Sequence, residues 1–144
     1  EAATDEFRAY QRRTVENAAV LAQTLRDAGT ELVSGGTDNH LILVDVTPLG
    51  VNGTEAEQLL DDVGITVNKN AIPFDPLPPN TASGIRVGTP AVTTRGFGPE
   101  EMRRVGELIV RTLRDREDEA ALDAVKVEVK EICARFPVPG LTDA

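Results

Sequence analysis

Apolar residues recur every three or four positions along four segments of the chain, and this spacing predicts four amphipathic helices. The segments are 7–25, 54–63, 99–113 and 122–136. Gly29, Gly64 and Pro137 follow three of them as helix-ending residues. Thr54 and Glu57 form a capping-box signature, so the second helix is expected to begin there.

Four shorter apolar stretches are typical of β-strands. They are 31–33, 41–46, 65–67 and 85–87. The second is apolar almost throughout, which predicts a strand buried on both faces. In the fourth, Ile85 and Val87 alternate with Arg86, so the arginine is expected on the face opposite to its two neighbours.

A proline-rich segment, residues 68–84, separates the last two predicted strands and contains four of the nine prolines. Proline fixes φ and removes a backbone donor, so this segment is predicted to be a stiff loop. Ile72, Phe74 and Leu77 favour an ordered loop, because they are side chains that it can bury. Long loops inside a compact domain are usually functional when they are ordered.

The order helix, two strands, helix, strand, loop, strand, helix, helix predicts one α/β domain of the α+β two-layer kind. A small three- to four-stranded sheet would pack against the helices. The 144 residues are enough for one core, and aromatic residues make up only 3%, so Val, Leu, Ile and Ala must fill it.

The composition excludes several classes of function. A net charge of −9 opposes binding to nucleic acid, and one His with one Cys cannot form a zinc cage or an internal disulfide. No apolar run approaches the roughly 20 residues that a membrane span needs. We therefore expect a cytoplasmic protein with no metal site, no nucleic-acid partner and no membrane partner.

The basic residues in the middle of the chain are few. Between Arg26 and Arg95 only Lys69 and Arg86 are basic, among nine acidic residues. Arg86 lies on a predicted strand beside the proline-rich loop, and its planar guanidinium suits the recognition of a carboxylate by two hydrogen bonds. The alternative is an ion pair with one of the nearby acids.

Three other polar features are interpreted as structural. The segment 34–37, Ser-Gly-Gly-Thr, is interpreted as a turn and not as a phosphate-binding loop, since it fits neither the glycine-rich fingerprint of dinucleotide-binding proteins nor the P-loop. His40 begins a buried strand without a nucleophile nearby, and Cys133 lies on an amphipathic helix.

Three longer runs add a resemblance that patterns alone cannot give. They are 33–41, which holds Ser-Gly-Gly-Thr-Asp-Asn-His, 64–76, which holds Asn-Lys-Asn, and 83–97, which opens with Ser-Gly-Ile-Arg. Together they resemble the C-terminal small domain of serine hydroxymethyltransferase over essentially the whole chain. The resemblance implies a pyridoxal-phosphate enzyme of the aspartate-aminotransferase fold type. Such enzymes interconvert serine plus tetrahydrofolate with glycine plus methylenetetrahydrofolate.

The resemblance also implies roles for three residues. Arg86, in the Ser-Gly-Ile-Arg motif, would grip the α-carboxylate of the amino-acid substrate. Asn70 would approach the pterin ring of the folate, and Lys69 would face the folate's anionic tail. No catalytic residue and no cofactor lysine is expected within this chain, because the family carries them on a large domain that would precede Glu1.

Residues 1–144 are accordingly expected to be the C-terminal small domain, with 1–28 as an interdomain helix and the large domain absent. Its partners would be that large domain, serine or glycine, and folate, in a homodimer or homotetramer. Two alternatives remain: a free-standing, non-catalytic binding module, and a domain of a related aldolase or α-methylserine-type transferase. An upstream cofactor lysine would separate the first alternative from the leading hypothesis, and dependence on folate would separate the second.

Overall fold

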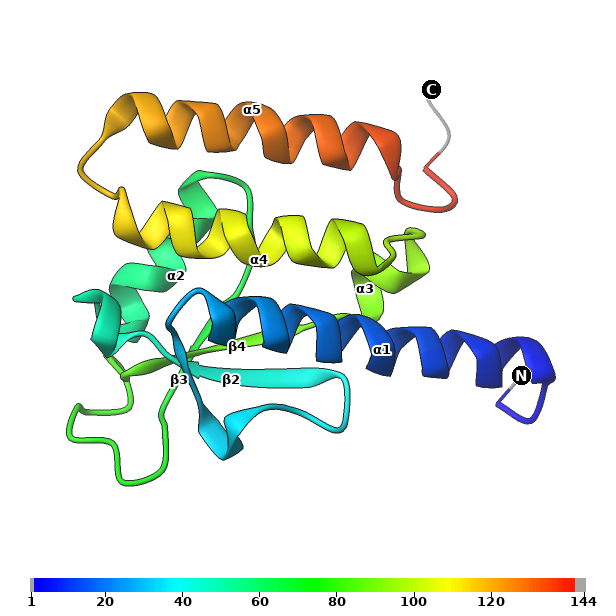
Figure 1. Cartoon of the computed structure of the whole chain (residues 1–144), viewed down its shortest axis with the longest axis horizontal. Helices are drawn as coiled ribbons and strands as arrows, with labels where there is room; N and C mark the ends of the chain where they lie inside the picture. The colour runs from blue at the N-terminus through cyan, green and yellow to red at the C-terminus, as the bar shows by residue number, and fades with distance from the viewer. Residues whose placement is uncertain (1, 142–144) are drawn as a thin grey trace.

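The computed structural model describes residues 2–141, which form an antiparallel sheet and a group of helices (Figure 1). The helices are α1 (Asp5–Asp27), α2 (Gly53–Asp62), α3 (Pro90–Thr94), α4 (Pro99–Arg114) and α5 (Glu119–Arg135). The strands are β1 (Glu31–Leu32), β2 (Leu41–Asp45), β3 (Asn68–Asn70) and β4 (Gly84–Gly88).

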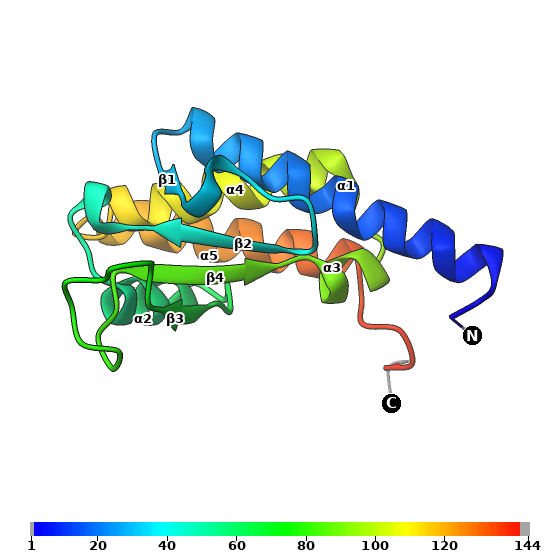
Figure 2. The same cartoon turned by 90° about the horizontal axis from the view of Figure 1, so that it is seen from below.

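The sheet has the order β1-β2-β4-β3, with each neighbouring pair antiparallel. α1 and α2 contact the strands, α4 packs on both of these helices, and α5 packs on α4. In Figure 2, α4 and α5 lie behind β2 and β4, whose other face is turned to the viewer. The fold is therefore the predicted α+β two-layer arrangement, with one face of the sheet open.

Aliphatic side chains fill the core between the sheet and the helices. Ile42, Val44, Ile85 and Val87 line the inner face of the sheet and are all at most 8% exposed. α1, α2 and α4 supply the facing leucines and isoleucines, and Phe97 is the one buried aromatic side chain in the described part of the chain. The prediction of an aliphatic core is confirmed.

β2 is covered on one face only, so the prediction of a strand buried on both faces is wrong. Ile42 and Val44 are buried, whereas Leu43 is half-buried and Leu41 is 37% exposed. A one-sided layer of helices produces this alternation, because successive side chains of a strand point to opposite faces.

The third strand lies at 68–70, three residues beyond the predicted 65–67, which form no strand. Residues 65–67 instead carry the chain from the end of α2 to the sheet, and Val67 is buried on the way. The strand forms at Asn68–Asn70 because these residues pair with the free edge of β4, although β-propensity alone does not favour such a polar segment. The short helix α3 was not predicted either.

The N-cap of α2 lies two positions earlier than expected. The capping box consists of Asn52 and Glu55, not Thr54 and Glu57: the Glu55 N–H donates to Asn52 Oδ1 at 2.9 Å and the Asn52 N–H to Glu55 Oε2 at 2.8 Å. Thr54 donates its N–H and its hydroxyl to the Thr81 carbonyl, both at 3.0 Å. The proline-rich loop thus supplies acceptors that let the helix start sooner.

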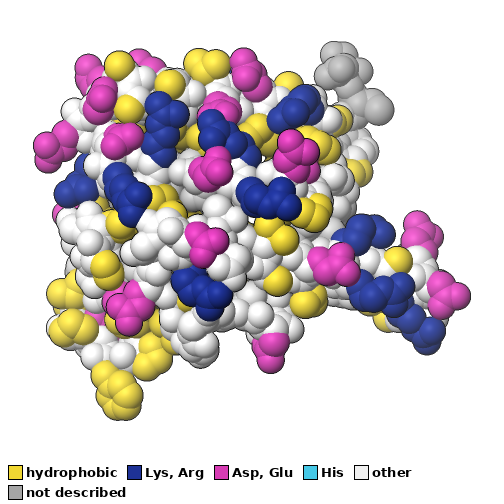
Figure 3. Space-filling model, in the orientation of Figure 1, with side chains coloured by type: hydrophobic (Ala, Val, Ile, Leu, Met, Phe, Trp, Pro, Cys, Tyr) yellow, Lys and Arg dark blue, Asp and Glu magenta, His cyan; other side chains and the backbone are white. Residues whose placement is uncertain are grey.

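The surface divides into a charged region and an apolar one (Figure 3). Basic and acidic side chains mix over α4 and α5, and hydrophobic side chains gather at the lower left, over the proline-rich loop. No helix among residues 2–141 is long and apolar enough to cross a membrane.

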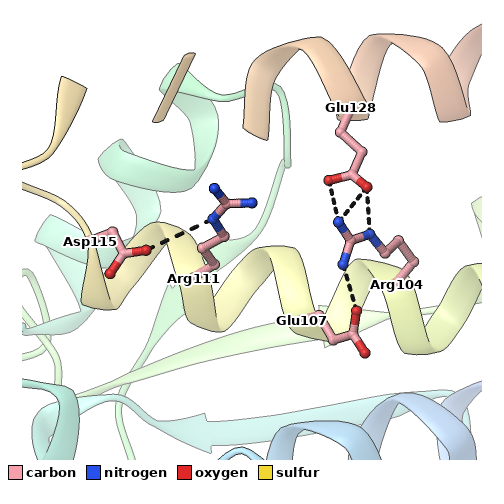
Figure 4. A network of polar contacts seen from close by, with 5 residues as sticks. All are labelled: Arg104, Glu107, Arg111, Asp115 and Glu128. Atoms are coloured by element: carbon pink, nitrogen blue, oxygen red, sulfur yellow. Dashed lines mark hydrogen bonds and ion pairs between the residues drawn. The ribbon is translucent and has the colours of Figure 1, made fainter. Parts of the chain in front are cut away.

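A salt-bridge network connects α4 to α5 (Figure 4). Arg104 donates from Nε to Glu128 Oε1 at 2.5 Å, from Nη2 to Glu128 Oε2 at 2.6 Å, and from Nη1 to Glu107 at 2.7 Å. The hydrogen bonds that Arg104 donates to Glu107, and then those to Glu128, raise the pKa of Arg104. Because the Arg104 guanidinium binds both oxygens of Glu128, it holds α5 against α4 and also restricts sliding of one helix along the other.

Candidate functional site

Arg86 lies on the open face of the sheet. Its neighbours Ile85 and Val87 are buried on the inner face, and Arg86 itself is exposed. The alternation along β4 confirms the predicted direction of the side chain. β4 is paired on both sides at this position, with Leu43 of β2 and Asn68 of β3, so the backbone beneath Arg86 is fixed.

The sheet register places Asn70 on the same face as Arg86. Directly opposite residues of an antiparallel pair share a face. Asn68 lies opposite Arg86, and Asn70 lies opposite Gly84, two residues along the same strand. The Asn70 side-chain amide donates to the Ala71 carbonyl at 2.8 Å. Arg86 and Asn70 therefore occupy adjacent rows of one surface.

Lys69 is not brought to that surface. It lies opposite Ile85, whose side chain is on the inner, helix-covered face. The backbone N–H of Lys69 donates to Glu57 Oε1 of α2 at 3.2 Å, which fixes the edge strand against that helix. Lys69 is half-buried there, on the other side of the sheet edge from Arg86.

The guanidinium of Arg86 has no ion pair or hydrogen bond within residues 2–141. Asp45 shares its face of the sheet, but this carboxylate accepts from the Thr47 N–H at 2.9 Å and the Thr47 hydroxyl at 2.6 Å. Arg95, by contrast, is bound to the Phe136 and Cys133 carbonyls at 2.7 and 3.1 Å. Arg86 thus presents a free, planar pair of donors to solvent.

Asp75 holds the proline-rich loop, residues 71–83, together. Its Oδ2 accepts from the Ile72 and Ser83 N–H groups at 3.1 and 2.9 Å. Its Oδ1 accepts from the Leu77 N–H at 2.9 Å and from the Ser83 hydroxyl at 2.6 Å. One carboxylate therefore ties the start, the middle and the end of the loop to one point.

These hydrogen bonds favour the charged form of Asp75. The Ser83 hydroxyl contributes most, partial burial opposes it, and the backbone N–H groups of Leu77, Ser83 and Ile72 add to it, so the pKa falls from 3.8 to about 2. We call these four hydrogen bonds to the Asp75 carboxylate the clasp. Because the pKa of Asp75 is lower in the folded than in the unfolded chain, the stability that the clasp contributes is fully present above about pH 4 and is lost as the pH falls through about 2.

We expect this loss to be visible by amide NMR of the chain. The amide shifts of Ile72, Leu77 and Ser83 should titrate together with a midpoint near pH 2, because all three amides donate to Asp75. Asp75→Asn serves as the control and should abolish this titration. A midpoint near 3.8, the ordinary value for an aspartate, would contradict the clasp.

Further contacts fix the two ends of the loop. A Cβ on Gly84 would lie 2.8 Å from Ile72 Cγ2, so Ile72 covers Gly84 on the open face, one row from Arg86. The Gly53 N–H, at the start of α2, donates to the Ala82 carbonyl at 2.8 Å. The loop is thus attached both to the sheet and to a helix.

The expectation that Phe74 is buried is wrong. Its side chain is 103% exposed, and its φ of 57° is unusual for a residue with a side chain. Ile72 and Leu77 are half-buried, as expected of an ordered loop. The contacts of Asp75 with Ile72 and Leu77 turn the chain inward on both sides of Phe74, which leaves the ring outside.

The remaining candidates from the sequence show no ligand-binding geometry. His40 is exposed directly before β2, Cys133 is half-buried on α5, and the segment 34–37 begins within a short 3-10 helix, Val33–Gly35, in which Ser34 has φ 65°. No cluster of three potential metal ligands occurs in the described range 2–141.

Sequence reasoning missed Asp75 and Ser83. The available signal was an aspartate placed directly before a proline, since aspartate side chains commonly accept hydrogen bonds from backbone N–H groups a few residues away. The bond to Ser83, eight residues later, has no such local signature.

Comparison with known proteins gives one family. The family model described as serine hydroxymethyltransferase matches residues 1–109. The matched part contains the whole sheet, the proline-rich loop and the surface that carries Arg86 and Asn70.

Proposed function

This chain belongs to the serine hydroxymethyltransferase family, and from that premise we propose that it is the C-terminal small domain of a pyridoxal-phosphate-dependent member. The reaction proposed for the complete enzyme interconverts serine plus tetrahydrofolate with glycine plus methylenetetrahydrofolate. The domain contributes binding and orientation of both substrates. The complete enzyme is proposed to be a cytoplasmic homodimer or homotetramer.

The unpaired guanidinium of Arg86 is the observation that carries this proposal. Although the chain is acidic, with 24 Asp and Glu residues, no carboxylate within residues 2–141 pairs with this arginine, which lies on a central strand. Two of its parallel N–H groups match the two oxygens of an α-carboxylate. When its carboxylate is held in this way, the amino acid can still rotate about the bond between the carboxylate carbon and the α-carbon. Its other contacts must fix that rotation.

Asn70 supplies the second proposed contact, to the pterin ring of folate. A side-chain amide presents a donor and an acceptor side by side, which suits the paired polar groups of a pterin edge. Its row on the sheet is adjacent to that of Arg86, so the two substrates would meet over the open face. Lys69 remains a proposal for the folate tail only, reached around the sheet edge.

The residues of this chain do not fit pyridoxal phosphate. The three lysines are Lys69 on the edge strand, Lys126 paired with Asp123 at 3.2 Å, and Lys130 on α5, and none shares a face with Arg86. The cofactor is therefore proposed to bind a large domain that precedes Glu1. α1 supports an interdomain role for residues 1–28, because its first turns project beyond the rest of the molecule (Figures 1 and 2).

The test is borohydride reduction of the natural gene product, followed by measurement of its intact mass. Reduction traps a cofactor bound to its lysine. We expect a chain much heavier than 15.4 kDa that carries a pyridoxyl adduct, and we expect the unreduced protein to require tetrahydrofolate for the conversion of serine. A bare chain of 15.4 kDa would contradict the proposal, and activity without folate would assign the domain to a related aldolase.

A further inference from the structure

We propose that Asp75 is a positioning residue that sets the geometry between Arg86 and Asn70. The inference rests on the proposed function of those two residues. Asn70 lies directly before the proline-rich loop, and Arg86 lies three residues after Ser83, the last residue of the loop. Whatever fixes the two ends of this loop also fixes the distance between the two proposed ligand contacts.

β3 has few interactions of its own beyond its pairing with β4 and the bond from the Lys69 N–H to Glu57 Oε1 of α2 at 3.2 Å. It has only three residues, Asn-Lys-Asn, and pairs with β4 at three positions on the edge of the sheet. None of its residues is fully buried. A short polar edge strand has little apolar surface to hold it in register.

The Asp75 carboxylate supplies a further constraint, at the loop end of β3. It binds the Ile72 N–H, two residues after Asn70, and the Ser83 N–H and hydroxyl, just before Gly84. The loop ends are thereby joined next to the Asn70–Gly84 pair, which is the last pair of β3 with β4. Closing the loop at that point restricts the freedom of the Asn70 end of β3 to slip or separate from β4.

Asp75 acts through other residues and not on a ligand. Its two oxygens accept four hydrogen bonds, two each, which is the full capacity of a carboxylate. No acceptor site remains for a substrate. The same donors also stabilise its negative charge, because they lower the pKa of Asp75 to about 2.

Backbone strain occurs beside both parts of the clasp. Phe74, next to Asp75, and Ala82, next to Ser83, both have φ 57°. Together with Ser34 they are the residues other than glycine that have positive φ in the described chain. Such conformations persist only where surrounding contacts determine them, and they are common at binding sites. The hydrogen bonds of Asp75 lie next to both residues, and Ala82 is held in addition by its N–H bond to the Pro78 carbonyl at 2.9 Å and by the bond from the Gly53 N–H at 2.8 Å.

The decisive experiment measures kinetics of the complete enzyme with Asp75→Asn and Ser83→Ala. Asp75→Asn replaces two acceptor positions by a donor at nearly equal volume, and we expect KM for both serine and tetrahydrofolate to rise about 10-fold with kcat changed less than about 3-fold. Ser83→Ala removes one of the four bonds and should raise both KM values about 3-fold. Asp61→Asn, which neutralises an exposed carboxylate without a side-chain hydrogen bond in the described structure, should change neither.

A direct structural readout keeps the test independent of activity. In the 144-residue chain, cross-strand NMR contacts between Asn70 and Gly84 should weaken in Asp75→Asn and persist in Asp61→Asn. A lowered Tm with unchanged KM values and unchanged cross-strand contacts would make Asp75 merely structural and overturn the inference. Arg86→Lys distinguishes a failure of the positioning role from a failure of the proposed function. If Arg86→Lys impairs serine binding while Asp75→Asn does not, only the positioning role of Asp75 is refuted. Normal serine binding in Arg86→Lys would refute the proposed function itself.

Discussion

Arg86→Lys in the complete enzyme is expected to raise KM for serine by about 100-fold, the effect of losing a bidentate, charge-assisted pair of hydrogen bonds. Lysine keeps the charge but replaces the planar fork by a single point donor on a flexible stem. The substrate carboxylate could then rotate about one contact. KM for tetrahydrofolate should change much less, because Asn70 and its row of the sheet are untouched.

The matched control is Arg103→Lys. Arg103 is also an exposed arginine without an ion pair or hydrogen bond in the described structure, but it lies on α4, in the helical layer. The same chemical change there should leave both KM values as they are. Steady-state kinetics with each substrate varied in turn will decide the matter. An Arg86→Lys enzyme with an unchanged affinity for serine would remove Arg86 from the site.

The direction of Arg86 could be predicted because it depends only on local geometry. Two buried β-branched neighbours on a strand force the residue between them to the other face. The long helices α1, α4 and α5 were predictable for a similar reason, since their apolar stripes repeat over several turns. Features that depend on a pattern repeated within one helix or strand can therefore be predicted from the sequence.

The position of β3 could not be predicted, because it is decided by a partner far away in the sequence. Ile65-Thr66-Val67 has the alternation of a strand, yet the edge of β4 pairs with the polar Asn68–Asn70. The Asp75 clasp could not be predicted for the same reason. Its strongest hydrogen bond comes from Ser83, which the loop must first bring back to within hydrogen-bond distance of Asp75. The exposure of Phe74 follows from that clasp and not from the hydrophobicity of its ring.

Gly84→Ala is expected to be the most destabilising of the changes considered at the site. A Cβ at this position would lie 2.8 Å from the Asn70 carbonyl oxygen, 2.9 Å from the Val44 carbonyl oxygen and 2.8 Å from Ile72 Cγ2. Two of these neighbours are backbone atoms of the adjacent strands, so the methyl group can be accommodated only if β2, β4 and β3 separate. We expect a loss of about 3 kcal/mol in the free energy of unfolding and a fall in Tm of about 10 °C.

Gly36→Ala is the matched control for Gly84→Ala. Gly36 has an extended φ of 168°, which alanine can adopt, and no atom lies within 4 Å of a Cβ placed there. Its substitution should change the free energy of unfolding by less than about 0.5 kcal/mol. Thermal and urea unfolding of the two variants, side by side, separate the general effect of adding a methyl group from the effect of crowding at Gly84.

The position of Gly84 also connects stability with the proposed site. It lies between Asn70 and Asp45 on the open face and two residues before Arg86. A methyl group that pushes β3 away from β4 would therefore move Asn70 relative to Arg86 even in molecules that remain folded. Equal Tm values for Gly84→Ala and Gly36→Ala would show that the three strands do not approach so closely at this point. The clasp by Asp75 would then have no tight pairing to maintain.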